Sequence, residues 1–336
     1  MLSPSLAAKL SALASARENW DHELPALLAE LSALPADLVV HASREIALAA
    51  QLGWQPLMTR LIAGFSGEPI YVRDLALMRR SPDYAWIFLF HPNGHVREAA
   101  LDTLQTPPDS AFFLSALIWR LNDWAEPVRR AAARYLQRIQ LQISPQIGAS
   151  SAADLLDRRH NWGRWTSEAD LLDQIVGRPD VLPIIAGFLQ RTANGALAKY
   201  LRHALRYPAI DPYLPVLAAA AIQPQVRAIA YRCLLTGHIS WFAGFESRWI
   251  DKVYGIKQRV PKVESRALGD GKPATELFWH AARDRSVIVR RAAADALMAT
   301  RARVPDEDRL IALFEQDESP SVRERGDFLR RHPPVH

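Results

Sequence analysis

The chain has 336 residues, and 49% of them are hydrophobic, so it can bury a continuous core and does not have the composition of a disordered polymer. Its 41 basic and 36 acidic side chains leave a formal charge of only +5, which excludes a polycation and is compatible with an anionic partner without requiring one. The single cysteine, Cys233, excludes an intrachain disulfide and fits a reducing compartment, so we expect a cytoplasmic protein.

The first half of the sequence predicts a series of helices. Residues 1–35 are expected to form an N-terminal helical cap, because Leu6, Leu10 and Leu13 recur at helical spacing. No signal peptide is expected, since Lys9 interrupts the apolar stretch and the start lacks basic residues. Further helices, separated by turn signals, are predicted at residues 36–51, 57–65, 70–80, 84–90, 96–105, 110–121 and 127–139.

The second half continues the helical pattern with two departures from it. Residues 152–177 match the pattern weakly, and residues 237–273 form an irregular insertion rich in aromatic and basic side chains. The longest apolar run, Leu214 to Ile222, is far shorter than the about 20 residues of a transmembrane helix, so no membrane association is expected. Helices are predicted at 181–190, 196–207, 213–222 and 226–235, and helix pairs at 274–300 and 305–331.

One short phrase recurs along the chain: a Val followed by an Arg at the start of a predicted helix, with a turn before it. Most of the later intervals between copies are close to whole multiples of about 32 residues, and a period of about 20–50 residues is typical of a solenoid. Three copies carry an aspartate six residues before the Arg, namely Asp123, Asp284 and Asp317. The copies are Val72-Arg73, Val96-Arg97, Val128-Arg129, Val226-Arg227, Val289-Arg290 and Val322-Arg323.

This arrangement resembles the HEAT repeat family, in which each repeat has a helix A, a turn with an aspartate and a helix B that opens with Val-Arg. The resemblance covers about residues 35–142 and 178–332. It implies an all-α fold, an α-α superhelix of antiparallel helix pairs, with residues 1–336 as a single HEAT-like solenoid. It also implies a structural ladder of aspartates and arginines between neighbouring repeats, which assigns a mainly structural role to Asp123, Asp284, Asp317, Arg129, Arg290 and Arg323.

Two predicted B helices carry basic residues on one face at helical spacing. In HEAT-like solenoids the B helices line the concave surface, so these residues are candidates for gripping phosphates or an acidic protein face. The alternative is a solvated helix face whose arginines pair with nearby acids such as Glu126. The first stripe consists of Arg130, Arg134 and Arg138, and the second stripe consists of Lys199, Arg202 and Arg206.

The insertion at residues 237–273 is the second candidate binding element. Its seven basic and four acidic side chains give a local charge of +3. Trp and Tyr beside Arg and Lys are typical of protein hot spots and of base stacking alike. The alternative is that these aromatics fill core left by an irregular repeat. Because function concentrates in elaborations of a regular scaffold, the candidate partner-binding residues here are Trp241, Trp249, Lys252 and Tyr254.

One enzyme family offers a comparison at the level of spacing. Alkylpurine DNA glycosylases built of HEAT-like repeats place a Trp and an Asp one helical turn apart on the concave face, with further Trp. Trp119 and Asp123 have that spacing, and Trp162 or Trp165 would be the second aromatic. Asp123 also occupies the ordinary repeat-turn position, however, which favours a structural role.

Other chemical motifs are weak. Cys233 is expected to be a buried core residue, since no His or Asn pattern supports a nucleophile. Residues 269–273 lack the spacing of a phosphate loop and are interpreted as a turn. The histidine pairs His91 and His95, and His332 and His336, lack a third ligand, so we expect no metal and no other cofactor.

Together these patterns predict a non-catalytic repeat protein that binds a macromolecular partner through its concave B-helix face. The expected partner is another protein, with an acidic surface opposite the basic stripes. The alternative is a nucleic-acid-binding protein related to the alkylpurine DNA glycosylases. A third hypothesis is a modifying enzyme of the bilin-lyase or hydroxylase kind.

Overall fold

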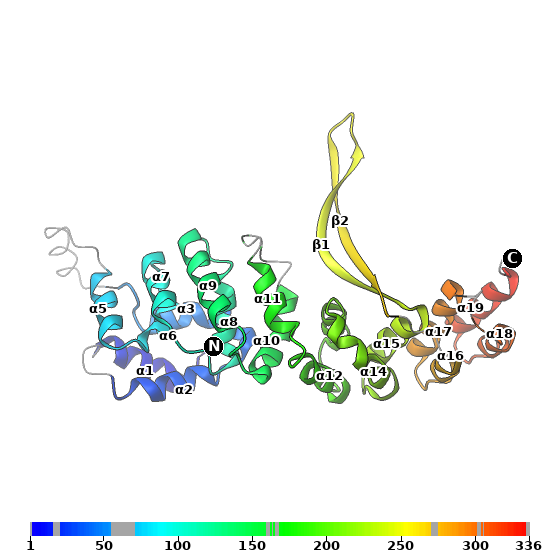
Figure 1. Cartoon of the computed structure of the whole chain (residues 1–336), viewed down its shortest axis with the longest axis horizontal. Helices are drawn as coiled ribbons and strands as arrows, with labels where there is room; N and C mark the ends of the chain where they lie inside the picture. The colour runs from blue at the N-terminus through cyan, green and yellow to red at the C-terminus, as the bar shows by residue number, and fades with distance from the viewer. Residues whose placement is uncertain are drawn as a thin grey trace. The chain divides into compact units, whose positions relative to one another are not determined.

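The computed structural model describes two compact units of the chain, Met1–Val181 (unit 1) and Leu182–His336 (unit 2). Most of the regular structure in both units is helical, which confirms the predicted class (Figure 1). The predicted helix at 57–65 lies outside the described residues, as do residues 270–273 of the faint phosphate loop, Trp165 and His336. The structure describes residues 2–15, 21–54, 71–158, 162, 164, 168–269, 275–300, 304 and 306–333.

Unit 1 consists of helices whose ends follow local sequence signals. The side chain of Asn93 accepts a hydrogen bond from the His95 N–H at the start of α7, and that of Ser110 accepts one from the Phe113 N–H at the start of α8. Residues 1–35, which are expected to be helical, contain α1 and α2. The elements are α1 (Pro4–Ser15), α2 (Leu24–Ser32), η2 (Ala36–Leu38), α3 (Val39–Ala49), α5 (Val72–Arg80), α6 (Tyr84–Phe88), α7 (Gly94–Thr103), α8 (Ala111–Arg120), α9 (Glu126–Ile139), α10 (Pro145–Arg158) and α11 (Ala169–Val176).

Unit 2 contains helices and one long β-hairpin. Helices α15 and α19 each begin with a proline in the first turn, where a backbone N–H would have no partner within the helix. The elements are α12 (Leu182–Arg191), α13 (Leu197–Ala204), η3 (Pro208–Tyr213), α14 (Leu214–Ala220), α15 (Pro224–Thr236), β1 (His238–Asp251), β2 (Ile256–Ala267), α16 (Thr275–Ala282), α17 (Val287–Thr300), α18 (Glu307–Glu315) and α19 (Pro320–Arg331).

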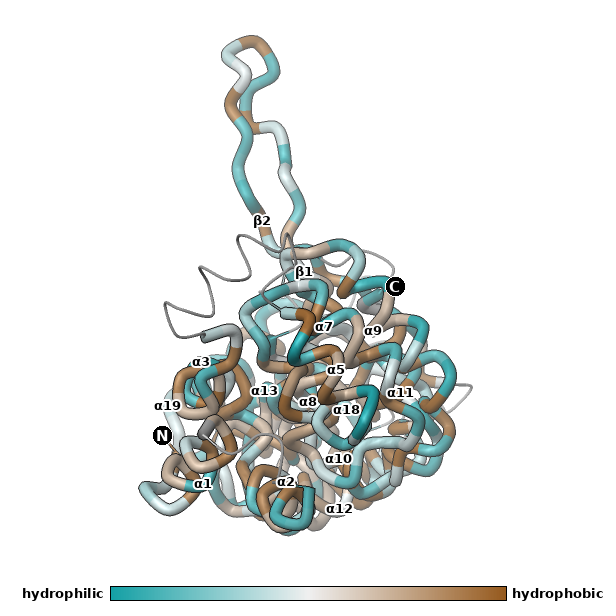
Figure 2. Tube along the Cα trace, turned by 90° about the vertical axis from the view of Figure 1, so that its left-hand side faces the viewer, coloured by the Kyte–Doolittle hydropathy of each residue, from teal (hydrophilic) through white to brown (hydrophobic). Residues whose placement is uncertain are grey.

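The β-hairpin is the main difference from the predicted fold. The sequence pattern predicts an irregular insertion at 237–273, whereas the structure shows β1 paired antiparallel with β2 from His238 opposite Ala267 to Asp251 opposite Ile256. The hairpin projects from the helices of unit 2, and hydrophobic and hydrophilic residues are interspersed along it (Figures 1 and 2). A regular element therefore stands where the sequence shows only a break in the helical pattern.

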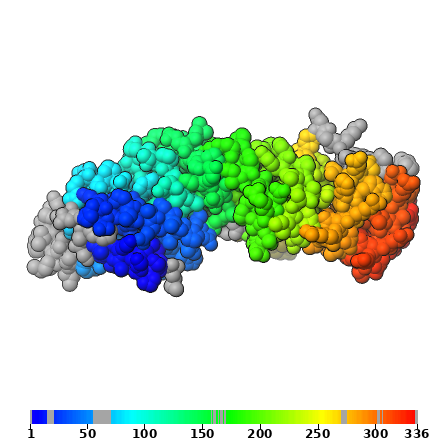
Figure 3. All heavy atoms as spheres, turned by 90° about the horizontal axis from the view of Figure 1, so that it is seen from below, coloured from blue at the N-terminus to red at the C-terminus, as the bar shows by residue number. Residues whose placement is uncertain are grey.

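Helices within each unit pack in rows. In unit 1, helices α5, α7, α9 and α11 contact one another in that order, and in unit 2 helices α13, α15, α17 and α19 do the same. Each of α7, α9, α15, α17 and α19 also contacts the helix that precedes it in the chain. Neighbours in space within unit 2 are therefore neighbours in sequence, as the succession of green, orange and red atoms in Figure 3 shows.

Small residues of the Val-Arg helices lie in the core between these rows. Ala131 and Ala132 of α9 and Ala293 and Ala294 of α17 are fully buried. The absence of a longer side chain at these positions allows the helices to pack closely. These four alanines, which follow the Val-Arg phrase, are thus core residues.

Ala293→Leu is expected to overpack this core and to lower the free energy of unfolding by roughly 1–3 kcal/mol. The measurement is the urea midpoint of the full chain followed by circular dichroism. Ala299→Leu, at an exposed position of the same helix, is the matched control and should leave the midpoint almost unchanged. Equal midpoints for wild type and Ala293→Leu would contradict the packing described here.

A search for membrane-spanning helices among the described residues finds no single helix that is long and apolar enough. By length and composition alone, one bent pair passes together, Leu24–Ser32 with Ala36–Ala49, at an angle of 101°.

Candidate functional site

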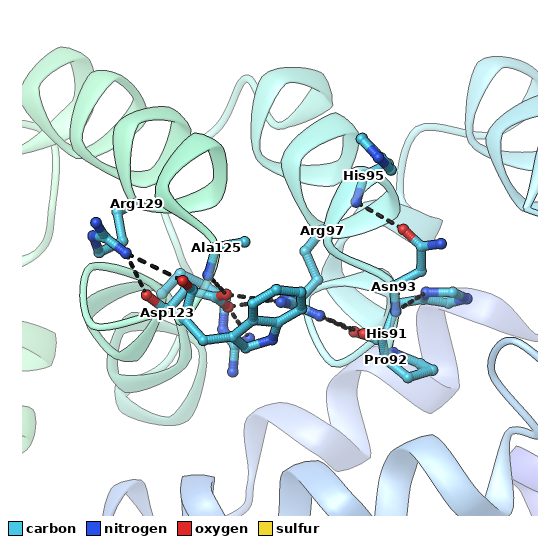
Figure 4. Close-up of polar contacts among 10 residues, drawn as sticks. His91, Pro92, Asn93, His95, Arg97, Asp123, Ala125 and Arg129 are labelled. Atoms are coloured by element: carbon cyan, nitrogen blue, oxygen red, sulfur yellow. Dashed lines mark hydrogen bonds and ion pairs between the residues drawn. The ribbon is translucent and has the colours of Figure 1, made fainter. Parts of the chain in front are cut away.

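A set of arginine–aspartate contacts links successive helix pairs. The guanidinium of Arg97 on α7 donates two hydrogen bonds to the carboxylate of Asp123, of 2.9 and 2.7 Å, in the turn before α9 (Figure 4). Arg227 binds Asp284 in the same bidentate way at 2.9 Å, and Arg290 binds Asp317 at 2.6 and 3.0 Å. These contacts join successive helix pairs, and we call their six residues the ladder. They include the three predicted aspartates and Arg290, whereas Arg97 and Arg227 take the places for which the resemblance implies Arg129 and Arg323.

The ladder residues also stabilise the turns on which they lie. Arg97 Nη1 donates to the backbone carbonyls of His91 and Pro92, and Asp123 accepts from the N–H of Ala125. Arg129 and Arg323, which have the same sequence position, donate to the carbonyls of their own turns. These arginines and aspartates therefore bind carbonyl and N–H groups of the turns as well as one another, which supports the structural role that the sequence predicts for them.

The ladder places the hairpin as an insertion between two neighbouring helix pairs. Arg97 and Asp123 are 26 positions apart, and Arg290 and Asp317 are 27 positions apart. Arg227 and Asp284 make the same contact although they are 57 positions apart. The excess matches the length of the hairpin, His238–Ala267. The helices on both sides thus pack as direct neighbours, and the hairpin leaves the stack between them.

The base of the hairpin is fixed to the helices of unit 2. The side chain of Ile239 is fully buried. The guanidinium of Arg266 binds the carboxylate of Asp211 at 2.5 and 2.6 Å and the carbonyl of Leu205 at 3.0 Å. At the start of β1, Gly237 takes a left-handed conformation with φ of 65°, which lets the chain leave α15. The base is therefore anchored by apolar burial and by a charge-assisted hydrogen-bond network.

One face of the hairpin carries aromatic rings covered by cations. The ammonium of Lys257 lies 4.1 Å from the ring centre of Trp249, directly across the strand pair, and the guanidinium of Arg259 lies 4.2 Å from that of Phe245. Phe245 in turn makes an edge contact with Phe242 at 5.2 Å. Such cross-strand pairs stabilise a two-stranded hairpin, which is marginal by itself in water.

The outer half of the hairpin exposes apolar side chains and unpaired cations. Val253 is 89% exposed, Tyr254 79% and Trp249 46%, and Ile250 and Ile256 are exposed as well. Four cations of this half have no ion pair with any described acid, namely Arg248, Lys252, Lys257 and Arg259. Because two strands form the whole sheet, each strand also keeps one unpaired edge. Trp249 and Tyr254 therefore do not fill a core, and Trp241 is half-buried nearer the base.

The first stripe of arginines lies on the solvent side of α9 in unit 1. Arg130 is near Glu126 at 3.8 Å, and Arg134 pairs with Asp102 at 2.9 Å. Arg138 donates to the carbonyl of Leu104 at 2.6 Å and lies over the Tyr135 ring. Each arginine of this stripe thus has an intramolecular partner, which agrees with the alternative of a solvated helix face.

The second stripe lies in unit 2, on and just after α13. Lys199 and Arg202 are exposed, and Arg206 donates to the carbonyl of Phe242 on β1 at 3.3 Å. The structure therefore brings Arg206 to the base of the hairpin, close to Arg266 and its partner Asp211. The two stripes belong to different units, and each is a separate surface here.

A pocket of about 290 Å³ opens beside the ladder in unit 1. Arg120 forms part of its lining and donates from Nη1 to Asp123 at 2.7 Å, so that Asp123 binds two guanidiniums. Burial opposes ionisation of Asp123, but the hydrogen bonds from Arg97 and the charge of Arg120 hold its pKa below the ordinary value. Arg120 is not among the residues predicted from the sequence, although it stands only three positions before Asp123.

This geometry bears on the glycosylase comparison. Trp119 and Asp123 do lie beside one pocket, but the Asp123 carboxylate is already neutralised by Arg97 and Arg120, and the Trp119 ring is covered by the Arg120 guanidinium at 3.9 Å. A carboxylate that stabilises a cationic purine has to be available to it. The structure therefore lends no support to that role for Asp123.

The remaining chemical motifs are the single cysteine and the histidines. Cys233 is buried, as predicted, and burial raises the pKa of its thiol to about 12. His91 is buried and contacts Asp74 through Nε2 at 3.1 Å, while its Nδ1 accepts the Asn93 N–H. Among the described residues, no three His, Cys, Asp or Glu side chains gather as a potential metal site.

Comparisons with known proteins add no relative: no family model, no curated protein and no solved structure matches this chain.

Proposed function

We propose that the chain is a HEAT-like α-solenoid. Three observations support this architecture: the repeated Val-Arg phrase, the rows of helices within each unit, and the ladder between successive helix pairs. In such a fold each repeat contacts mainly its neighbours, so surface side chains vary without disturbing the stack. A long element can therefore be inserted between two repeats at low cost, and the hairpin is such an element.

We further propose that the protein is a non-catalytic binding protein and that the outer half of the hairpin is its contact surface for another protein. The observation that carries this proposal is the projection of exposed Trp249, Val253 and Tyr254 from an otherwise well-packed helical unit. Exposed apolar groups that are kept together mark interaction sites. The unpaired strand edges offer a partner main-chain hydrogen bonds as well.

The expected partner has an acidic surface. Arg248, Lys252, Lys257 and Arg259 surround the apolar residues without paired acids, whereas Asp251 is occupied by the N–H groups of Val253 and Tyr254 in the turn. Charges at the rim of an interface mainly increase the association rate, and buried aromatics mainly prolong the complex. The proposed binding surface is therefore the hairpin and not the predicted B-helix stripes. Each arginine of the first stripe already has an intramolecular partner.

Nucleic-acid binding remains the second candidate because of one observation, the cation–aromatic pairs Lys257–Trp249 and Arg259–Phe245. Aromatic rings and cations in alternation suit stacked bases and phosphates. The apolar tip favours a protein instead, since interfaces with nucleic acid are more polar and more strongly positive.

A photo-cross-linking amino acid placed at Tyr254 distinguishes these candidates in extracts of the native host. We expect cross-links to one or a few proteins that persist after nuclease treatment. The same amino acid at Leu141, which is equally exposed in unit 1, is the control and should not give these products. Cross-linking to nucleic acid alone would favour the second candidate, and no cross-link at Tyr254 would contradict both.

Variants of the hairpin sharpen the same experiment. Trp249→Ala should reduce the cross-linking yield at every salt concentration, because its ring is a direct contact. Lys257→Ala should reduce the yield mainly at low salt, since exposed charges are screened beyond about 10 Å at 0.1 M salt. Both variants should keep the wild-type thermal midpoint of the helices, because neither side chain is buried and the cross-strand pair that they lose stabilises the hairpin alone.

A further inference from the structure

The pocket beside the ladder in unit 1 contains a buried cation with unused hydrogen-bonding capacity. Arg120 is 6% exposed, and its Nε is buried with no hydrogen-bond partner among the described residues. Its Nη1 binds Asp123, while Arg97, which also lines the pocket, uses its donors on Asp123 and on two carbonyls. A buried donor without an acceptor is destabilising, so an acceptor that reaches Arg120 is favoured.

The charge of the pocket is positive. Two buried guanidiniums, those of Arg97 and Arg120, share the one carboxylate of Asp123. Burial and the like charge of Arg97, only partly offset by Asp123, lower the pKa of Arg120 to about 10, so it stays charged at neutral pH. Arg44 and Arg164 add two exposed cations at the lining, neither of which has an ion pair with a described acid. The pocket thus holds one more positive than negative charge inside and two further cations at its edge.

Aromatic side chains form the walls. The Trp119 ring lies under the Arg120 guanidinium at 3.9 Å and holds it in place. Trp124 is 68% exposed and lines both this pocket and a neighbouring one of about 430 Å³. A large apolar ring so exposed between two hollows offers a flat surface to a ligand, as ring stacking needs.

We propose that this pocket binds a small aromatic anion, with its carboxylate or phosphate group on the Arg120 guanidinium and its ring against Trp124. The anionic group of the ligand would complement the buried cation, which the carboxylate of Asp123 does not fully neutralise. The ring of the ligand would complement the exposed indole beside it. The site lies in unit 1 and is independent of the hairpin surface of unit 2.

Titration calorimetry of the full chain in low-chloride buffer tests this proposal with three probes. Benzoate and phenyl phosphate carry both features, and benzamide has the shape of benzoate without its charge. We expect benzoate and phenyl phosphate to bind at least about tenfold more tightly than benzamide, the factor that one charge-assisted hydrogen bond supplies. Equal binding of benzoate and benzamide, or no binding of any probe at millimolar concentration, would overturn the proposal.

Two variants assign the binding to this pocket. Trp124→Ala removes the exposed ring, and Arg44→Gln removes an exposed cation; neither side chain belongs to the buried core, so both variants should fold. Each should weaken binding of benzoate several-fold, whereas Arg130→Gln, on the solvent side of α9, should leave it unchanged. Arg120→Lys, which keeps the charge and loses the guanidinium geometry, should weaken binding further. Unchanged affinity in Trp124→Ala and Arg120→Lys would place the probe elsewhere and refute the assignment.

Discussion

Asp123→Ala is expected to lower the stability of unit 1 by roughly 3–5 kcal/mol, the cost of removing one partner from a buried ion pair. The Arg97 and Asp123 side chains are only 3% and 1% exposed, and the variant would leave Arg97 and Arg120 as neighbouring buried cations without a carboxylate. Hydrogen exchange of peptides from residues 84–139 measures this loss locally, because a row of helix pairs need not unfold in one step. We expect protection in these peptides to fall by more than about a hundredfold.

Two controls make this result specific. Asp102→Ala breaks the exposed pair with Arg134 and should cost at most about 1 kcal/mol. Asp317→Ala should cost less than Asp123→Ala, since its partner Arg290 is more exposed, at 16%. A smaller effect for Asp123→Ala than for Asp317→Ala would contradict the importance of burial.

The same carboxylates predict acid sensitivity. The pKa values of Asp123, Asp284 and Asp317 lie below the ordinary value in the folded protein, because the ladder arginines and turn N–H groups outweigh the opposing effect of burial. A lowered folded pKa means that their stabilisation is complete above the unfolded value near about 4 and is lost as the pH falls through the folded value. The difference in stability between wild type and Asp123→Asn should therefore shrink below about pH 4.

The helices and the ladder could be predicted from the sequence because both depend on local patterns. Buried residues such as Leu6, Leu10 and Leu13 recur at helical spacing, and each ladder residue stands at a fixed distance from a turn. The sequence assigns Arg290 and the three aspartates to the ladder, but it indicates Arg129 and Arg323 where the structure shows Arg97 and Arg227. The contact of Arg120 with Asp123 is local, since only three positions separate them, and it is missed because Arg120 lies outside the Val-Arg phrase.

The hairpin could not be predicted in the same way. A strand is recognised by alternating burial, but beyond Ile239 both faces of β1 and β2 are exposed or half-buried, so no alternation is imposed on the sequence. Pro261 within β2 and the bulge between Phe242 and Gly244 break the pattern further. The signals that do exist are the Asp251 turn with Gly255 at φ of 68°, and the aromatic residues of β1 that lie near cations of β2, namely Trp249 near Lys257 and Phe245 near Arg259.

The basic stripes show that the side chains on one helix face can be predicted while their partners cannot. Helical spacing correctly places Arg130, Arg134 and Arg138 on one solvent-facing side of α9, yet spacing within one helix carries no information about its neighbours. The partners of Arg134 and Arg138, Asp102 and the Leu104 carbonyl, come from the preceding part of the chain, 32 and 34 positions away. Whether an exposed cation is available to a ligand thus depends on contacts with neighbouring helices.

Replacing Phe242–Val263 by Asn-Gly is expected to abolish partner binding and leave unit 2 folded. The shortened hairpin keeps Ile239 in the core and the Arg266–Asp211 contact at the base, and Asn-Gly suits a tight turn between the remaining strands. The Arg227–Asp284 contact continues to join the helix pairs on both sides, as Arg290–Asp317 does without any insertion. The free energy of unfolding of unit 2, measured by urea titration, should therefore change by no more than about 1 kcal/mol.

For the binding measurement, the protein that cross-links at Tyr254 is purified and titrated against the wild-type chain and against the truncated chain. The truncated chain should lose detectable binding, and the double variant Val253→Ser with Tyr254→Ser should retain part of it, because the strand edges and the cations of Arg248 and Arg259 persist. If truncation unfolds unit 2, the hairpin is part of the scaffold. If the folded truncated chain binds with wild-type affinity, the contact surface lies on the helices. Only a folded truncated chain that no longer binds agrees with a hairpin that the packing of the helices does not need and that partner recognition requires.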